Sequence, residues 1–341
     1  MFKSKPYLLY QKGYEPFIDF FKGYLILCIL FTHSCDIWMP LRERSLYYLW
    51  GCAPTACFMM ISTMHIFRKG LNNASITLGK HIKKVLLPFL IIQLSALIIN
   101  IILKPINEVF EGIPAFIKSG GYGIGSYFPW VYIQYILLMM ILCPIVKKIH
   151  DRRKLFLFFL IISITIELLC SLFKLDDGWY RILVLRYPFL IYLGLLLDED
   201  GVFLSVKRCV ISLMGLFFII MFTYGNVNFE PIFYNSTWKT YHWICYPYLA
   251  FFLTFFVYVL YAKTKDFHFS RLMIRIGKSS YGIYLFQLIW FMFPLASRTR
   301  MGGWEIVLYL VISISVCTFC GILLNEKVLD KVYNHQGNIK I

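Results

Sequence analysis

The chain has 341 residues, of which 59% are hydrophobic and only 15% are charged, and its formal net charge is +16. A mean hydropathy of +0.68 is more than a soluble core of this size needs, so the composition indicates an integral membrane protein. Most Lys and Arg residues fall in the segments predicted to be cytoplasmic. The basic charge is therefore explained by membrane topology, which argues against nucleic-acid binding.

Ten apolar stretches are long enough, or nearly so, to cross about 30 Å of hydrocarbon. They are predicted at residues 17–38, 46–67, 85–103, 129–146, 155–173, 182–197, 209–224, 244–261, 279–295 and 306–324. The sequence thus predicts an all-α integral membrane protein, a bundle of about ten transmembrane helices. An even number of spans, combined with the positive-inside rule, places both the N- and C-termini in the cytoplasm. Residues 1–341 are expected to form a single membrane-embedded domain.

The first predicted span carries two basic residues, Lys22 and His33, eleven positions apart. Eleven steps of about 100° come within about 20° of three full turns, so both side chains lie on one face of the helix, about 16 Å apart along its axis. An imidazole at bilayer depth is costly to desolvate and indicates function. Two structural alternatives remain: His33 can bond a neighbouring helix, and Lys22 can extend to the cytoplasmic interface.

Two other costly residues lie in later spans. Glu167 is in the outer half of the fifth predicted span, and Arg186 is near the outer end of the sixth. They could pair with each other, or Glu167 could help to orient a substrate, and the sequence leaves both alternatives open.

Two further patterns are interpreted as structural. Ten cysteines are spread singly through the apolar spans, which is typical of packing, and no metal site is predicted. The glycines at 120, 121, 123 and 125 lie in the long polar stretch 104–128, which is predicted to be external. With no strand before them they are interpreted as a flexible loop and not as a phosphate-binding loop.

The first span resembles that of the acyltransferase-3 family. Asp19, a basic residue at Lys22, Gly23, an apolar run and then His33 are similar to the family's first-helix pattern, although Lys22 stands where Arg is usual. This departure keeps the charge but weakens bidentate phosphate recognition.

Further matches to the family follow in the expected order along the chain. They are Phe58–Ser62 in the second span, Lys80–Pro88 before the third, Trp130 with Tyr135 and Pro144 after the external loop, and Ile276–Leu285 near the end. Two further positions depart from the family pattern. Thr63 replaces a usual Gly, and Gln287 replaces a frequent His, which leaves His33 as the one well-placed imidazole.

The resemblance implies an O-acyltransferase that moves an acetyl group from cytoplasmic acetyl-coenzyme A to a hydroxyl of an extracytoplasmic glycan. His33 is then the expected general base, because a neutral imidazole near pH 7 suits removal of an alcohol proton. Asp36, three residues on, is expected to orient the imidazole. Lys22, Lys83 and Lys84 are the expected contacts for the donor's phosphates, and Glu167 is a further candidate catalytic residue.

The expected setting is a bacterial cytoplasmic membrane, with lipid, acyl-coenzyme A and a cell-surface polysaccharide or related glycan as partners. Two other function classes stay open at this point. A secondary transporter or exporter of a lipid-linked sugar could use Glu167 and Arg186 as a relay, but the sequence has no convincing internal repeat. A non-catalytic scaffold of a glycan-assembly complex would leave the buried His33 unexplained.

Overall fold

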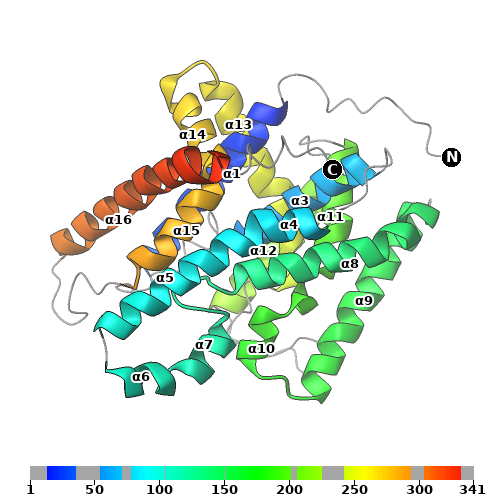
Figure 1. The fold of residues 1–341 in the computed structure, drawn as a ribbon. Helices are drawn as coiled ribbons and strands as arrows, with labels where there is room; N and C mark the ends of the chain where they lie inside the picture. Colours follow the sequence, from blue (N-terminus) through cyan, green and yellow to red (C-terminus); the bar gives the residue numbers. More distant parts are fainter. Residues whose placement is uncertain are drawn as a thin grey trace, which may run out of the picture. The chain divides into compact units, whose positions relative to one another are not determined.

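In the computed structural model, the described residues are 14–35, 54–70, 78–103, 105–149, 151–200, 206–224, 242–292 and 303–331. Every regular element in these ranges is a helix, which confirms the all-α prediction. The chain divides into two compact units. The helices α1 (Tyr14–Cys35), which contains His33, and α8 (Phe128–Lys148) each have residues assigned to both units. Both are labelled in Figure 1.

Six helical segments among the described residues are long and apolar enough to cross a membrane. They are Pro16–Cys35, Leu78–Leu103, Phe128–Lys148, Arg152–Leu172, Trp243–Thr264 and Gly303–Leu329. Two shorter apolar helices, Pro188–Leu197 and Val210–Met221, overlap the sixth and seventh predicted spans. Helices also overlap the predicted spans 46–67 and 279–295, but they are only 17 and 11 residues long. The predicted count of ten is therefore not established by helix length and composition.

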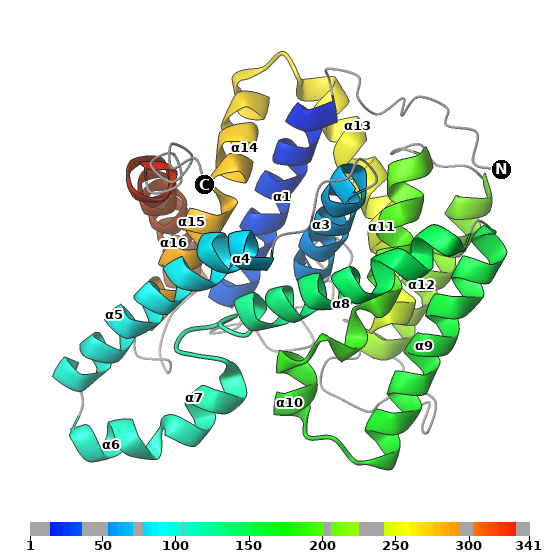
Figure 2. The same cartoon turned by 45° about the vertical axis from the view of Figure 1, so that its right-hand side comes forward.

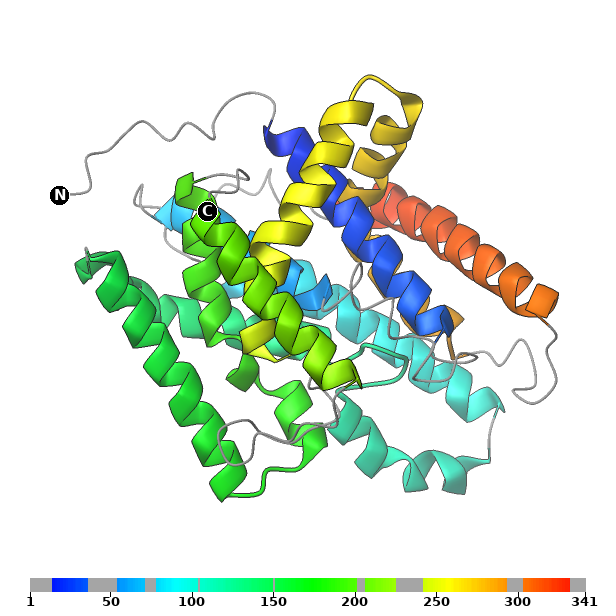
Figure 3. The ribbon, with the colours of Figure 1, turned by 180° about the vertical axis from the view of Figure 1, so that it is seen from behind.

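One unit comprises residues 1–18, 45–78 and 131–263. Besides most of α8, it contains α3 (Pro54–Gly70), α9 (Arg152–Leu172), α10 (Asp177–Ile182), η4 (Val184–Arg186), α11 (Pro188–Asp200), α12 (Val206–Tyr224), η6 (Trp243–Cys245), η7 (Tyr248–Leu253) and α13 (Thr254–Thr264). Small residues let these helices pack closely. A Cβ at Gly215 of α12 would lie 2.8 Å from the backbone nitrogen of Tyr248, and Figure 3 shows α12 beside the helix that begins with η7.

The predicted sixth span, 182–197, is interrupted. Its beginning is divided between α10 and the short 3₁₀ turn η4, and only from Pro188 does it continue as the helix α11. Proline is favoured in the first turn of a helix, where its missing N–H has no intrahelical partner in any case. The interruption places Arg186 in the turn before α11 and not within a continuous span.

The second unit comprises residues 19–44, 79–130 and 264–341. It contains most of α1, α4 (Leu78–His81), η3 (Ile82–Leu86), α5 (Leu87–Leu103), α6 (Ile106–Glu111), α7 (Ile113–Ser119), α14 (His268–Lys278), α15 (Ser280–Trp290), α16 (Gly303–Leu324) and η8 (Asn325–Leu329). The stretch 104–128, predicted as a loop, thus includes two short helices, α6 and α7, which follow α5 (Figure 2).

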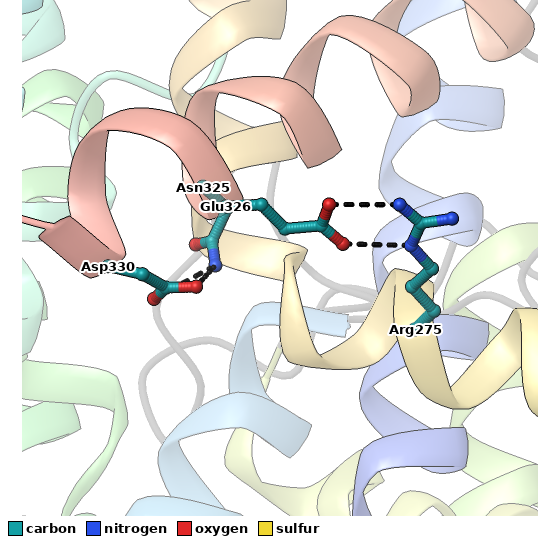
Figure 4. Close-up of polar contacts among 4 residues, drawn as sticks. All are labelled: Arg275, Asn325, Glu326 and Asp330. Atoms are coloured by element: carbon teal, nitrogen blue, oxygen red, sulfur yellow. Dashed lines mark hydrogen bonds and ion pairs between the residues drawn. The ribbon is translucent and has the colours of Figure 1, made fainter.

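Helices α15 and α16 pack antiparallel. A Cβ at Gly321 of α16 would overlap the backbone of Ile283 in α15, and Trp290 Nε1 near the other end of α15 donates a 3.1 Å hydrogen bond to Ser313 Oγ. At the surface of this unit, Arg275 of α14 forms a bidentate pair with Glu326 of η8, with N–O distances of 2.8 and 2.9 Å (Figure 4). Because this pair is exposed, it is expected to contribute little to stability.

Candidate functional site

His33 lies in the last turn of α1, and its side chain is half-buried within the second unit. The imidazole meets the ring of Phe291, which follows α15, edge-on at a centroid distance of 6.0 Å. Its other neighbours are Gly125 and Gln287. The imidazole, which is costly to desolvate, therefore faces other parts of this unit. This is expected both for a functional residue and for one that only contacts a neighbouring helix.

The segment with four glycines folds tightly beside His33. Gly120, Gly121, Gly123 and Gly125 all have positive φ angles, between 78° and 141°, which L side chains rarely adopt. A Cβ at Gly125 would lie 3.1 Å from Cε1 and 3.7 Å from Nε2 of His33. Only glycine at 125 lets the backbone approach the imidazole this closely without strain. The segment forms turns between α7 and α8, so the predicted loop is present, and its tight fold beside His33 is what the sequence did not predict.

Side chains from three helices hold the glycine segment in place. Gln93 of α5 accepts a hydrogen bond from the backbone N–H of Tyr122 at 2.6 Å and donates one to the carbonyl of Tyr122 at 3.1 Å. Trp130 Nε1 donates to Gly120 O at 2.7 Å, and Tyr284 Oη donates to Gly125 O at 3.0 Å. Tyr284 belongs to the Ile276–Leu285 motif, which covers the end of α14 and the start of α15, so this motif contributes to the surroundings of His33.

Gln287 lies one turn after Tyr284 on α15 and is fully buried. Its amide and the imidazole of His33 both lie within about 4 Å of the position that a Cβ at Gly125 would occupy. Neither of its amide atoms has a hydrogen-bond partner of good geometry among the described residues, and the same is true of His33 Nδ1. From the sequence, Gln287 was interpreted only as a departure from the histidine that is frequent at this position in the family. Gln287 could have been identified as a candidate site residue because it is an uncharged polar residue within the apolar part of α15.

Lys22, on the same helix as His33, pairs with Asp19. Its Nζ lies 2.8 Å from Asp19 Oδ1, and its side chain is 25% exposed. Here α1 crosses α14 with almost no space between the backbones. A Cβ at Gly277 would overlap the carbonyl oxygen of Asp19, and a Cβ at Gly23 would overlap that of Met273. The family-like glycines at 23 and 277 thus fix the position of the helix that carries both basic residues.

Lys83 and Lys84 lie in η3, the π-helical turn that leads into α5, and both are exposed. The hydroxyl of Tyr281 in α15 donates a hydrogen bond to the carbonyl of Val85, which anchors this turn to the same helix that carries Gln287. Asp36, the expected partner of His33, lies outside the described residues.

Glu167 is the centre of a buried polar cluster in the other unit. Tyr180 Oη donates a 2.7 Å hydrogen bond to Glu167 Oε1, and His242 Nε2 lies 3.3 Å from the same oxygen. His242 Nδ1 accepts the backbone N–H of Ile244, which leaves Nε2 on the side of Glu167. Burial and the neighbouring Glu167 raise the pKa of the Tyr180 phenol well above its ordinary value.

Arg186 belongs to the same unit and is also buried, with its guanidinium 5.0 Å from the centre of the Tyr187 ring. Its positive charge lowers the pKa of Tyr180, which opposes the effect of the Glu167 carboxylate. The two residues that the sequence suggested as a pair are thus both close to Tyr180. Tyr180 and His242 could not have been identified from sequence spacing alone.

Removing the Glu167 carboxylate should destabilise the protein. Glu167→Ala would leave the hydroxyl of Tyr180 buried without its acceptor, and such a loss costs about 1–3 kcal/mol. We expect a lower midpoint of thermal unfolding in detergent for Glu167→Ala. Tyr180→Phe, which removes one donor but keeps the carboxylate beside His242, should lower the midpoint less. Equal midpoints for Glu167→Ala and the unmodified protein would contradict this description of the cluster.

Comparison with protein families matches an acyltransferase domain to residues 15–324, which is most of the chain and includes His33, the glycine segment and Gln287. No curated protein and no solved structure gives a significant match. The extent of the family match and the apolar helices together indicate a multi-pass membrane acyltransferase. The chain belongs to the acyltransferase-3 family.

Proposed function

We propose that this protein is an O-acyltransferase that moves an acetyl group from cytoplasmic acetyl-coenzyme A to a hydroxyl of an extracytoplasmic glycan, with His33 as the general base. The observation that carries the proposal is the surroundings of His33. Its Nδ1 is buried without a partner among the described residues, and the backbone at Gly125 approaches the ring closely. A histidine that served only to join helices would be expected to use its nitrogens for that purpose.

The donor is proposed to bind along the face of α1 between Lys22 and His33. These residues are about 16 Å apart along the helix axis, a span that an extended thioester-bearing arm can cover while its phosphates stay near Lys22. Lys83 and Lys84 are exposed and are proposed to add positive charge for the nucleotide. Charge-assisted hydrogen bonds to phosphate would then compensate for the loss of the Lys22–Asp19 pair.

Lys22→Ala should raise the KM for acetyl-coenzyme A about tenfold and change the KM for the acceptor little, because only the donor carries phosphates. Lys22→Arg keeps the charge and should stay close to the unmodified protein. The matched control is Asp19→Asn, which removes the partner of Lys22 but leaves the ammonium. If Asp19→Asn harms donor use as much as Lys22→Ala, the pair is structural and Lys22 does not bind the donor.

The acceptor class can be tested by mass spectrometry of cell-envelope glycans from cells with and without this protein. The proposal expects an acetyl ester on one glycan that disappears with the protein and returns when it is restored. Unchanged acetylation, with an altered amount of the glycan itself at the cell surface, would instead support a transporter or a scaffold.

A further inference from the structure

The side-chain amide of Gln287 is fully buried but has no hydrogen-bond partner of good geometry in the part of the chain that the structure describes. Leaving a buried amide unpaired destabilises the folded protein, so a folded chain has no structural reason to keep one. The imidazole of His33 is a polar neighbour, since a Cβ at Gly125 would lie 3.7 Å from His33 Nε2 and 4.0 Å from Gln287 Nε2. The amide is thus available to form a hydrogen bond with a substrate group that lies next to His33, the proposed base.

Gln93 shows that this unit can satisfy a buried glutamine. It is also buried, and both of its side-chain atoms are used, one accepting from the N–H and the other donating to the carbonyl of Tyr122. Gln93 holds the glycine segment from one side. Gln287 and Gln93 are the same residue type, so the unpaired amide of Gln287 results from its surroundings.

The geometry also defines where Gln287 could act. The position that a Cβ at Gly125 would occupy lies 3.1 Å from His33 Cε1 and 4.0 Å from Gln287 Nε2. This point is therefore close to the proposed base and to an N–H donor. The absence of a side chain at 125 keeps the space next to both groups free of a Cβ atom.

We propose that Gln287 Nε2 binds the carbonyl oxygen of the acyl thioester and stabilises the negative charge that develops on it. This inference rests on the proposed function. A neutral donor suits the task because it adds no charge to the apolar interior until the oxyanion forms, and such preorganised donors act most strongly where water is excluded.

In this scheme the acceptor hydroxyl oxygen bonds to the thioester carbonyl carbon while His33 takes the hydroxyl proton. The electron pair of the C=O bond moves to the carbonyl oxygen, which Gln287 stabilises. When the tetrahedral intermediate collapses, the C–S bond breaks and the imidazolium returns its proton to the leaving thiolate. The products are the acetyl ester and the free thiol, so protons and electrons balance with no other reactant.

The test is Gln287→Met, which has a similar length and shape but no N–H donor. Losing one oxyanion donor typically reduces kcat by about 10²- to 10³-fold, and we expect a reduction in this range with little change in the KM for acetyl-coenzyme A. The midpoint of thermal unfolding should stay the same or rise, because an unsatisfied amide is removed from the interior. Gln287→His restores an N–H donor and should recover part of kcat.

Gln93→Met is the matched control, since the same substitution there removes two formed hydrogen bonds and should lower the unfolding midpoint. Unchanged kcat in Gln287→Met, while unmodified protein transfers acetyl, would overturn the role of Gln287 alone. A lower unfolding midpoint with an equal loss in kcat and binding would show a structural role instead. A shifted midpoint of the pH–rate profile would show that Gln287 acts through His33, which also overturns the proposal.

Absence of transfer by the unmodified protein would contradict the proposed function and, with it, the role of Gln287 in acyl transfer. The stability comparison between Gln287→Met and Gln93→Met does not depend on activity. It would still show whether the amide of Gln287 is unsatisfied in the folded protein, and a lower midpoint for Gln287→Met would overturn that premise.

Discussion

His33→Ala should reduce acetyl transfer by about 10²- to 10⁴-fold, the contribution typical of a positioned general base. The protein should still insert and fold. His33 Nδ1 forms no hydrogen bond of good geometry with the described residues, so its removal breaks no such bond. The measurements are the initial rate of transfer and the thermal unfolding midpoint of the same purified sample in detergent.

The control for this prediction is His268→Ala. His268 is exposed at the start of α14, so removing its imidazole should change neither the transfer rate nor the unfolding midpoint. If His33→Ala loses activity only in proportion to a loss of folded protein, His33 has a structural role. If it transfers at nearly the normal rate, it is not the base.

Gly277→Ala should be the most destabilising conservative substitution among the described glycines. Its Cβ would overlap the backbone carbonyl oxygen of Asp19, and a backbone atom cannot move aside as the end of a flexible side chain can. Overpacking of this kind costs about 1–3 kcal/mol or more, since α1 and α14 must separate. We expect a lower unfolding midpoint and a lower yield of folded protein. Activity should also fall, because α1 carries Lys22 and His33.

Gly79→Ala is the matched control for the helix-crossing prediction. Gly79 is in α4, in the same unit, and a Cβ there would meet no atom within 4 Å. Because Ala favours helix by about 1 kcal/mol relative to Gly, this variant should be as stable as the unmodified protein or slightly more stable. If both variants unfold at the same temperature, the close approach of α1 and α14 is not important for stability.

The sequence predicted the helices well because hydrophobic length is a local property. The long apolar runs around His33 and Glu167 became α1 and α9. The weaker predictions concern segments where a span is short or interrupted. Pro188 divides the predicted sixth span, and α15 has only 11 residues in the region predicted as 279–295. Hydropathy averaged over a window does not register such interruptions.

The sequence identified part of the candidate site. The spacing of Lys22 and His33 could be derived from helix geometry, and the family resemblance is confirmed. The role of the glycine segment was missed because composition alone does not show what a loop contacts. Its conformation depends on Gln93, Trp130 and Tyr284, which lie on other helices. Gln287 was missed because its unsatisfied amide becomes visible only when burial and hydrogen bonding are known.

The most direct test of the central claim is transfer of radiolabelled acetyl from acetyl-coenzyme A to envelope glycan by membranes that contain the unmodified protein or His33→Ala. The account predicts that label accumulates on the glycan as an alkali-labile ester with the unmodified protein. It also predicts that His33→Ala membranes, with the same amount of folded protein, give no more label than membranes without the protein. Equal labelling by both proteins would contradict the assignment of His33, and labelling by neither would contradict the proposed acetyl transfer to these glycans.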